Sequence, residues 1–171
     1  MANAANPLIP LDGTITITDA TGSPLSLVLA YEDGDLSIAG LNGQNQKSFQ
    51  SFRSRGKTYA VRAVEDTDIE FSFTAHAVGI IGDGTTALLG DVVLKKGVWA
   101  SATSKLPVAN GDAYLLQVAW TGERTNFGAA ADSVITMKYC ALTLDFSEGV
   151  PGKISIKGTC YPISTDYLTI S

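Results

Sequence analysis

The fold of this chain is decided by the stretch Ser133-Val-Ile-Thr-Met-Lys-Tyr-Cys-Ala-Leu-Thr-Leu-Asp-Phe-Ser-Glu-Gly-Val-Pro-Gly-Lys-Ile-Ser-Ile-Lys-Gly-Thr-Cys-Tyr161, which predicts two strands joined by a turn. Polar and apolar residues alternate on both sides of residues 147–152, where two glycines and a proline are typical of a turn. Because a one-residue slip would expose the apolar side chains, the pattern predicts one register. A hairpin centred on Val150 opposes three pairs: Phe146 with Ile154, Leu144 with Ile156, and Cys140 with Cys160.

The composition indicates one β-rich domain over residues 1–171. The chain has 17 glycines, and it is 45% hydrophobic but only 17% charged, whereas globular proteins average about 25% charged residues. A chain of this length can bury a core, and no repeat or linker divides it. The low charge also favours an oligomer, whose copies cover part of each other's surface.

Three features bear on the compartment. Residues 1–13 predict an irregular arm and lack the basic and apolar regions of a signal peptide. No apolar run approaches the roughly 20 residues of a membrane span. We therefore expect a cytoplasmic origin, where Cys140 and Cys160 would remain thiols although they could form one disulfide.

Other elements follow from periodicity. The sequence Asp33-Gly34 predicts a tight hairpin that would set Leu29 opposite Ile38. Residues 85–96 predict the one helix, capped by Asp83 or Thr85 and ended by Gly97. Alternation predicts strands over residues 14–18, 25–31, 58–65, 68–77 and 114–120, with a short strand at 167–170 in the C-terminal tail 162–171. The fold class is therefore mainly β and antiparallel, with a single helix.

Residues 40–57 show no periodicity and predict a long functional or disordered loop. Between residues 36 and 64 there are five basic residues and no acidic one, so this span carries +5; the whole chain carries −5, which leaves −10 on the remainder. Interleaved phenylalanines are typical of single-stranded nucleic-acid binding, but the acidic remainder would repel phosphate. A protein partner is favoured, because the loop of one copy can reach the acidic surface of the next and build a filament. The candidate interface residues are Lys47, Phe49, Phe52, Arg53, Arg55 and Lys57.

Two motifs could indicate catalysis or cofactor binding, and each has a simpler interpretation. Residues 82–87 match the loose dinucleotide fingerprint G-x-G-x-x-A, but no parallel βαβ unit or suitably placed acidic residue accompanies them. His76 is the only histidine, and no nucleophile signature lies near it. We expect no catalytic, cofactor or metal site, and hence a protein that is not an enzyme.

Several segments are informative through their order. The long basic loop follows a strand hairpin and leads into Arg53-Ser-Arg-Gly-Lys-Thr-Tyr-Ala-Val-Arg62 and then Ile69-Glu-Phe-Ser-Phe-Thr74. The predicted helix within residues 86–101 and the hairpin within residues 140–158 follow. In this order, over about residues 14–161, the chain resembles the tail tube (major tail) proteins of long-tailed bacteriophages.

The resemblance implies a β-sandwich or barrel-like subunit with one flanking helix. Subunits of that family form hexameric rings whose sheets join into an inner barrel, and stacked rings form the tube through which DNA leaves. Residues 40–57 would then reach the neighbouring ring. The implied partners are other copies of the chain, tail tip and tail terminator proteins, and genomic DNA that passes without specific binding; no membrane partner is implied. The implied location is the virion, after assembly in the host cytoplasm.

The channel of such tubes is typically electronegative, which makes the polar strand faces candidates for its lining. These candidates are Asp68, Glu70, Asp145 and Lys157.

Two alternatives stay open. One is a tube protein of a contractile tail or secretion system. The other is a monomeric β-sandwich binding module or adhesin, which would have a ligand pocket.

Overall fold

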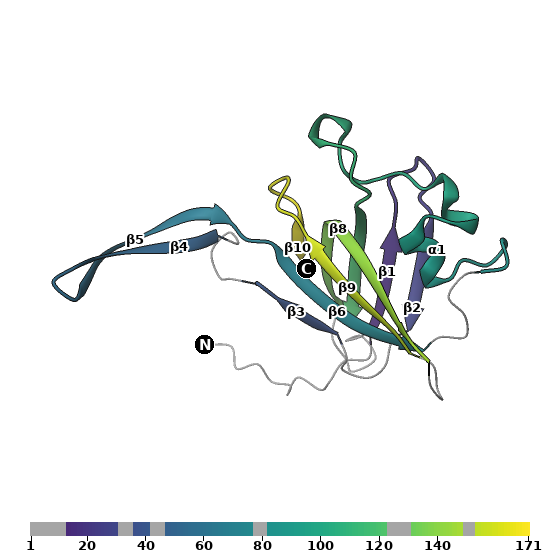
Figure 1. Ribbon diagram of the computed structural model, residues 1–171, viewed down its shortest axis with the longest axis horizontal. Helices are drawn as coiled ribbons and strands as arrows, with labels where there is room; N and C mark the ends of the chain where they lie inside the picture. The colour runs from purple at the N-terminus through teal and green to yellow at the C-terminus, as the bar shows by residue number, and fades with distance from the viewer. Residues whose placement is uncertain (1–12, 31–35, 42–46, 77–81, 123–130, 149–152) are drawn as a thin grey trace.

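The computed structural model describes residues 13–30, 36–41, 47–76, 82–122, 131–148 and 153–171 (Figure 1). The fold is mainly β with one α-helix, as the sequence predicts. One eight-stranded sheet has the order β2-β1-β7-β8-β9-β6-β3, with β10 paired to β8, and β4 and β5 form a separate two-stranded sheet. The elements are β1 (Gly13–Thr18), β2 (Ser26–Ala30), β3 (Ser37–Ala39), β4 (Lys47–Ser54), β5 (Lys57–Asp66), β6 (Ile69–His76), α1 (Leu89–Leu94), η1 (Gly97–Ser101), η2 (Val108–Asn110), β7 (Leu116–Gly122), β8 (Ser133–Ser147), β9 (Lys153–Cys160) and β10 (Leu168–Ile170).

The hairpin of β8 and β9 has the predicted register. Cys140 pairs with Cys160, Leu144 with Ile156, and Phe146 with Ile154. Alternation also predicts β6 correctly, because its odd-numbered apolar residues are buried while the intervening residues are partly or fully exposed. The core lies between this apolar face of the sheet and the segment containing α1 and η1, which contributes Leu89, Val92 and Trp99. The turn residues 149–152 lie outside the described residues.

The predicted hairpin between β2 and β3 is wrong. Leu29 pairs with Ile15 of β1, whereas Ile38 pairs with Phe71 of β6. The two strands therefore lie at opposite ends of the sheet order. The pairing of β2 with β1, the preceding strand, and of β3 with the more distant β6 outweighs the local turn signal at Asp33-Gly34. Those two turn residues lie outside the described part of the chain.

The helix is shorter than predicted at both ends. Asp83 caps a turn, not a helix: its Oδ1 accepts hydrogen bonds from the backbone N–H groups of Thr85 at 2.9 Å and Thr86 at 2.8 Å. The N-cap is Leu88, whose N–H donates to Asp91 Oδ2 at 2.9 Å. Lys95 ends α1 in the left-handed conformation with φ of 53°, and Gly97 begins η1.

The expectation of an irregular loop over residues 40–57 is wrong for residues 47–54, which form β4. Strand β4 pairs with β5, but the register shifts between Lys47 and Phe49 and again between Phe52 and Arg53. Each shift changes which face the following residues occupy, so a period of two cannot persist along β4. Residues 42–46 of the predicted loop and residues 1–12 of the predicted N-terminal arm lie outside the described residues.

Among the described residues, no helix has the length and apolar character that crossing a bilayer requires.

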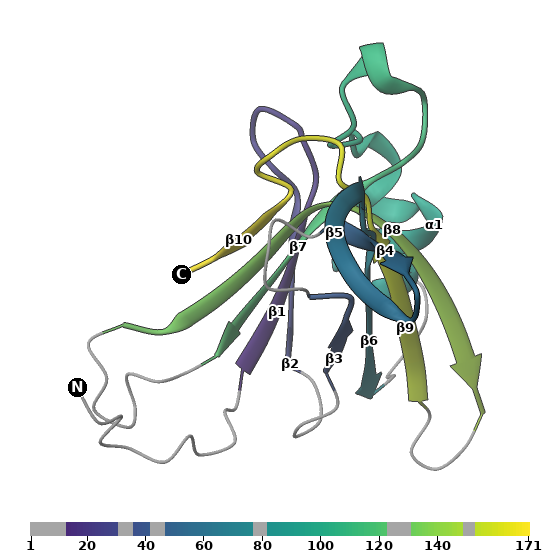
Figure 2. The same ribbon diagram turned by 90° about the vertical axis from the view of Figure 1, so that its left-hand side faces the viewer.

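The C-terminal tail contains the predicted short strand, β10, and pairs with β8 through Leu168 opposite Met137. Figure 2 shows β10 at the side of the main sheet, to which it belongs through β8. The structure thus has one main sheet and one projecting hairpin.

Candidate assembly surfaces

The hairpin of β4 and β5, hereafter the arm (residues 47–66), extends away from the main sheet (Figure 1). Its tip is a two-residue turn, Arg55–Gly56, with φ of 50° and 80°, closed by the pair Ser54 and Lys57. Positive φ at both central residues is the geometry of a type I′ hairpin, and glycine adopts it at little cost. The arm therefore forms locally and holds its tip away from the body.

The arm presents positive charge and apolar surface together. Arg53, Arg55 and Lys57 are exposed, and Phe52 is half-buried. The Arg62 guanidinium lies 5.9 Å from the centre of the Phe52 ring, at the distance of a cation–π contact. Val61, next to Arg62 in β5, is 59% exposed. In the described part of the chain, no third strand extends this two-stranded sheet.

All six residues predicted for the interface lie on or beside this hairpin. Lys47 is opposite Asp66 in the ladder, and Phe49 is opposite Ala63. The prediction left out two residues of β5, Val61 and Arg62, which pair with Ser51 and Gln50. Arg62 belongs to the same acid-free basic span, a signal that could have identified it. Only the pairing shows that β4 and β5 form one surface.

A polar face crosses β6, β9 and β8 on the side of the sheet opposite the core. Glu70 pairs with Thr159, Lys157 pairs with both Ser72 and Thr143, and Asp145 pairs with Ser155. The Lys157 ammonium donates to Asp145 Oδ2 at 2.9 Å, and both side chains are more than half exposed. The structure thus brings together three of the four predicted channel residues. The fourth, Asp68, is exposed and precedes β6.

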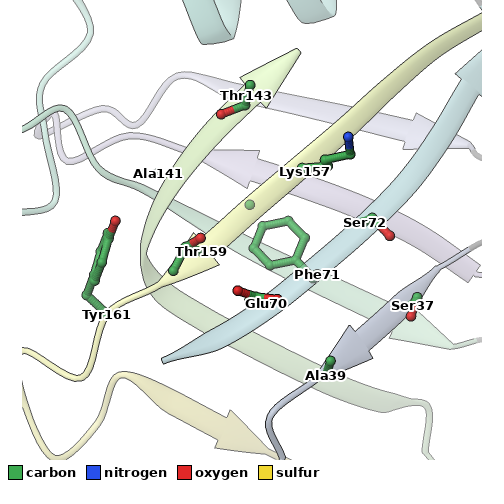
Figure 3. Close-up of a pocket in the computed structure, with 11 residues that line it drawn as sticks. Ser37, Ala39, Glu70, Phe71, Ser72, Ala141, Thr143, Lys157, Thr159 and Tyr161 are labelled. Atoms are coloured by element: carbon green, nitrogen blue, oxygen red, sulfur yellow. The ribbon is translucent and has the colours of Figure 1, made fainter. Parts of the chain in front are cut away.

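A trough of about 540 Å³ lies on this side of the sheet (Figure 3). Hydroxyl groups, two charges of opposite sign and two alanines form most of its wall. The described residues contain no group of three or more histidine, cysteine or acidic side chains placed to hold a metal. The trough combines hydroxyl, carboxylate and ammonium groups from β3, β6, β8 and β9. Its lining is Ser37, Ala39, Glu70, Phe71, Ser72, Ala141, Thr143, Lys157, Gly158, Thr159 and Tyr161.

The glycine motif of residues 82–87 precedes α1 and lies apart from this face. The N–H of Gly82 donates to Asp91 Oδ2 at 2.7 Å, and a Cβ at Gly82 would lie 1.8 Å from the Thr86 carbonyl oxygen. The glycine therefore serves a tight turn before α1, and its N–H is already bonded. His76 is the last residue of β6, opposite Lys153.

Two solved structures resemble this chain over nearly its whole length. One is the sheath/tube terminator of an extracellular contractile injection system (PVC) in its extended state; its TM-score is 0.60 at 8% identity, with 99% of each chain covered. The other is the tube-terminating cap of the anti-feeding prophage, with a TM-score of 0.52 at 10% identity, covering 100% of this chain and 95% of that chain. This chain shares their fold. No protein-family model and no curated protein sequence matches it.

Proposed function

We propose that the protein is a structural subunit of a phage-tail-like tube, in which copies form rings and the rings stack through the arm. The observation that carries the proposal is the arm itself, a basic two-stranded sheet that stands off the main sheet (Figure 1). The two solved structures that share this fold, a tube terminator and a tube cap, support an assembly of this kind.

The arm has a physical reason to dock. A lone two-stranded hairpin is marginally stable in water, because neither face is covered. Docking would bury Val61 and Phe52 and bring Arg53 and Arg55 to carboxylates of a neighbouring copy. The arm has five basic and two acidic residues, a net charge of +3, and the rest of the chain carries −8, which favours a head-to-tail contact. Such a contact is heterologous and repeats without closing, so it elongates.

Ring formation would use the edges of the main sheet. Strands β2 and β3 end the sheet order, and each has one hydrogen-bonded neighbour among the described strands. Val28 on β2 is 61% exposed. Joining the sheets of adjacent copies would satisfy these edges. We propose hexameric rings, as the resemblance to tail tube proteins implies, with Asp68, Glu70, Asp145 and Lys157 lining a channel through which DNA passes without specific binding.

The proposed role is non-catalytic. Its partners are further copies of the chain, the tail tip proteins at one end of the tube and the terminator proteins at the other. The proposed location is a virion or a related particle after assembly in the host cytoplasm.

A second candidate is a tube-terminating cap. Both solved structures with this fold favour it, since one is a sheath/tube terminator and the other a tube cap. In this case, we propose that the chain forms a ring that binds one tube end and does not polymerise. The distinction between the two candidates is therefore one of stoichiometry.

The deciding experiment is negative-stain microscopy with sedimentation velocity over a concentration series. A tube subunit forms hollow tubes of increasing length, whereas a cap stops at a ring of constant mass. A species that stays monomeric at every concentration contradicts both. The matched control removes the arm by joining Lys47 to Asp66, which face each other in the ladder, through an Asn-Gly turn. This variant is expected to keep the main sheet and to lose elongation.

A further inference from the structure

The two cysteines of the chain face each other in the centre of the sheet. Cys140 of β8 pairs directly with Cys160 of β9, and both thiols are free and 0% exposed. Opposed Cα atoms in an antiparallel ladder lie about 4.5–5.5 Å apart. That spacing falls inside the roughly 4.4–6.8 Å that disulfides span. Opposed side chains also share one face of the sheet, so the backbone already has the arrangement that a bond requires.

With the C-terminal tail docked, the folded protein shields both thiols from oxidants in solution. The Cys140 thiol donates to the Met137 carbonyl at 3.4 Å, and the Cys160 thiol donates to the Tyr167 carbonyl at 3.8 Å. Burial raises the pKa of the Cys140 thiol well above its ordinary value. Both cysteines are 0% exposed, so a small disulfide cannot reach either sulfur until the chain opens locally.

The C-terminal tail controls access to Cys160. Tyr167 is 7% exposed, and its carbonyl accepts both the Cys160 thiol and the Lys138 backbone N–H, the latter at 2.9 Å. The tail is held by the three-residue strand β10 and by the Lys138–Asp166 ion pair at the surface. A short ladder with few buried contacts opens more readily than the central strands. Undocking of the tail therefore exposes the sulfur of Cys160 first.

We propose that Cys140 and Cys160 are a latent disulfide, which a small-molecule disulfide oxidises after the C-terminal tail undocks. The Cys160 thiolate attacks one sulfur of the small disulfide, forms a mixed disulfide and releases one small thiolate. The Cys140 thiolate then attacks Cys160 Sγ, forms the Cys140–Cys160 bond and releases the second small thiolate. The small disulfide is reduced to two thiols, which take up the two protons lost by the protein.

The bond would fasten β8 to β9 at the point where the chain turns into the tail. It would close a loop of about 20 residues, and a loop of that size lowers the unfolding equilibrium constant on the order of 100-fold in the chain-entropy account. The subunit would gain this stability after it leaves a reducing compartment. The inference is independent of the proposed function, because a chain that forms no tubes still holds the opposed thiols.

The test incubates the folded wild-type protein with oxidised glutathione and follows intact mass and alkylation of thiols after quenching in denaturant. We expect loss of both alkylatable thiols, a mass lower by two hydrogens, no covalent dimer and unchanged circular dichroism. The oxidised protein should also resist urea more than the reduced protein. The single variants Cys140→Ala and Cys160→Ala cannot form the bond and serve as controls.

A matched pair of variants tests whether docking of the C-terminal tail limits the rate of oxidation. Asp166→Asn removes the ion pair of the tail and should accelerate oxidation roughly twofold to fivefold, the range expected for a surface pair. Asp145→Asn removes the surface ion pair with Lys157 and should leave the rate unchanged. Wild-type protein that keeps both thiols while folded, or forms only mixed or intermolecular disulfides, overturns the proposal. Equal rates for the two variants overturn the role of the tail.

Discussion

Asp19 Oδ2 accepts a hydrogen bond from the backbone N–H of Thr103 at 2.9 Å, across 84 positions of sequence. The other carboxylate oxygen accepts from the Leu25 N–H at 2.8 Å and from the Thr21 hydroxyl at 2.9 Å. Asp19 is 0% exposed. One buried carboxylate thus joins the β1–β2 connection to the chain that follows η1.

Replacement of Asp19 should destabilise the fold. In Asp19→Ala the N–H groups of Leu25 and Thr103 lose a buried acceptor, which should cost about 3 kcal/mol or more. Urea denaturation measures the loss. Asp112→Ala, at an exposed position, is the control and should change stability by less than about 0.5 kcal/mol. Equal midpoints for the two variants would show that Asp19 does not stabilise this junction.

Stability should fall in acid partly through the same group. Burial opposes ionisation of Asp19, but the hydrogen bonds from Thr103, Thr21 and Leu25 outweigh it and lower its pKa below 3.8. A lowered folded pKa gives stability that is fully present above the unfolded value and is lost as pH falls through the folded value. Urea midpoints should therefore decline below about pH 4. In Asp19→Asn the decline should be shallower; an identical slope would assign it to other carboxyl groups.

Charge reversal at the tip of the arm should stop elongation without unfolding the subunit. Arg53→Glu with Arg55→Glu turns attraction to an acidic neighbour into repulsion, while both side chains are exposed in the free subunit. Sedimentation and microscopy should show folded protein without tubes, and polymerisation of wild type should weaken with salt.

The control for the arm variant is Lys96→Glu with Lys105→Glu. It makes the same change of net charge on the body of the subunit and should still elongate. Tubes formed as readily by the Arg53/Arg55 variant as by wild type would remove the arm from the stacking contact.

The charge of the polar face should determine whether tubes retain or release DNA. Asp68→Lys with Glu70→Lys exchanges two exposed acids for bases, so tubes of this variant should retain DNA that wild-type tubes release, and salt should reverse the retention. Co-sedimentation of labelled DNA with preformed tubes measures it. Asp112→Lys with Glu148→Lys changes the charge equally at exposed loop positions. If both variants retain DNA equally, the effect is one of net charge and not of the channel.

Phe71 and Gly158 form a cross-strand pair that leaves no space for a methyl group. The two residues are opposed in β6 and β9, and a Cβ at Gly158 would lie 2.1 Å from Phe71 Cζ. Gly158→Ala should therefore destabilise the fold by about 1–3 kcal/mol. A double-mutant cycle with Phe71→Leu measures the coupling in urea. Additive losses would mean that the ring and the glycine do not contact each other.

Local sequence patterns predict which interface residues are exposed, but they do not predict the hairpin on which these residues lie. The positions of Arg53, Arg55 and Lys57 on one exposed segment follow from composition alone, because an acid-free basic span has no local reason to be buried. Their place on a hairpin does not follow, because the register shifts in β4 remove the alternation that reveals a strand. The acidic helix cap shows the same limit: Asp83 does cap a turn, but Asp91 decides where α1 begins.

The sequence by itself determined the elements whose residues alternate strictly, above all β6 and the β8–β9 hairpin. There a shift of one residue would expose a whole apolar face, so one register is far more stable than its neighbours. Only the tertiary structure decided which strands lie side by side. Strand β2 pairs with β1, which directly precedes it, whereas β3 pairs with β6, beyond β4 and β5 in the chain, so β2 and β3 lie at opposite edges of the sheet. Local turn chemistry cannot encode that choice, since the free energy of such contacts depends on the assembled core and not on neighbouring residues.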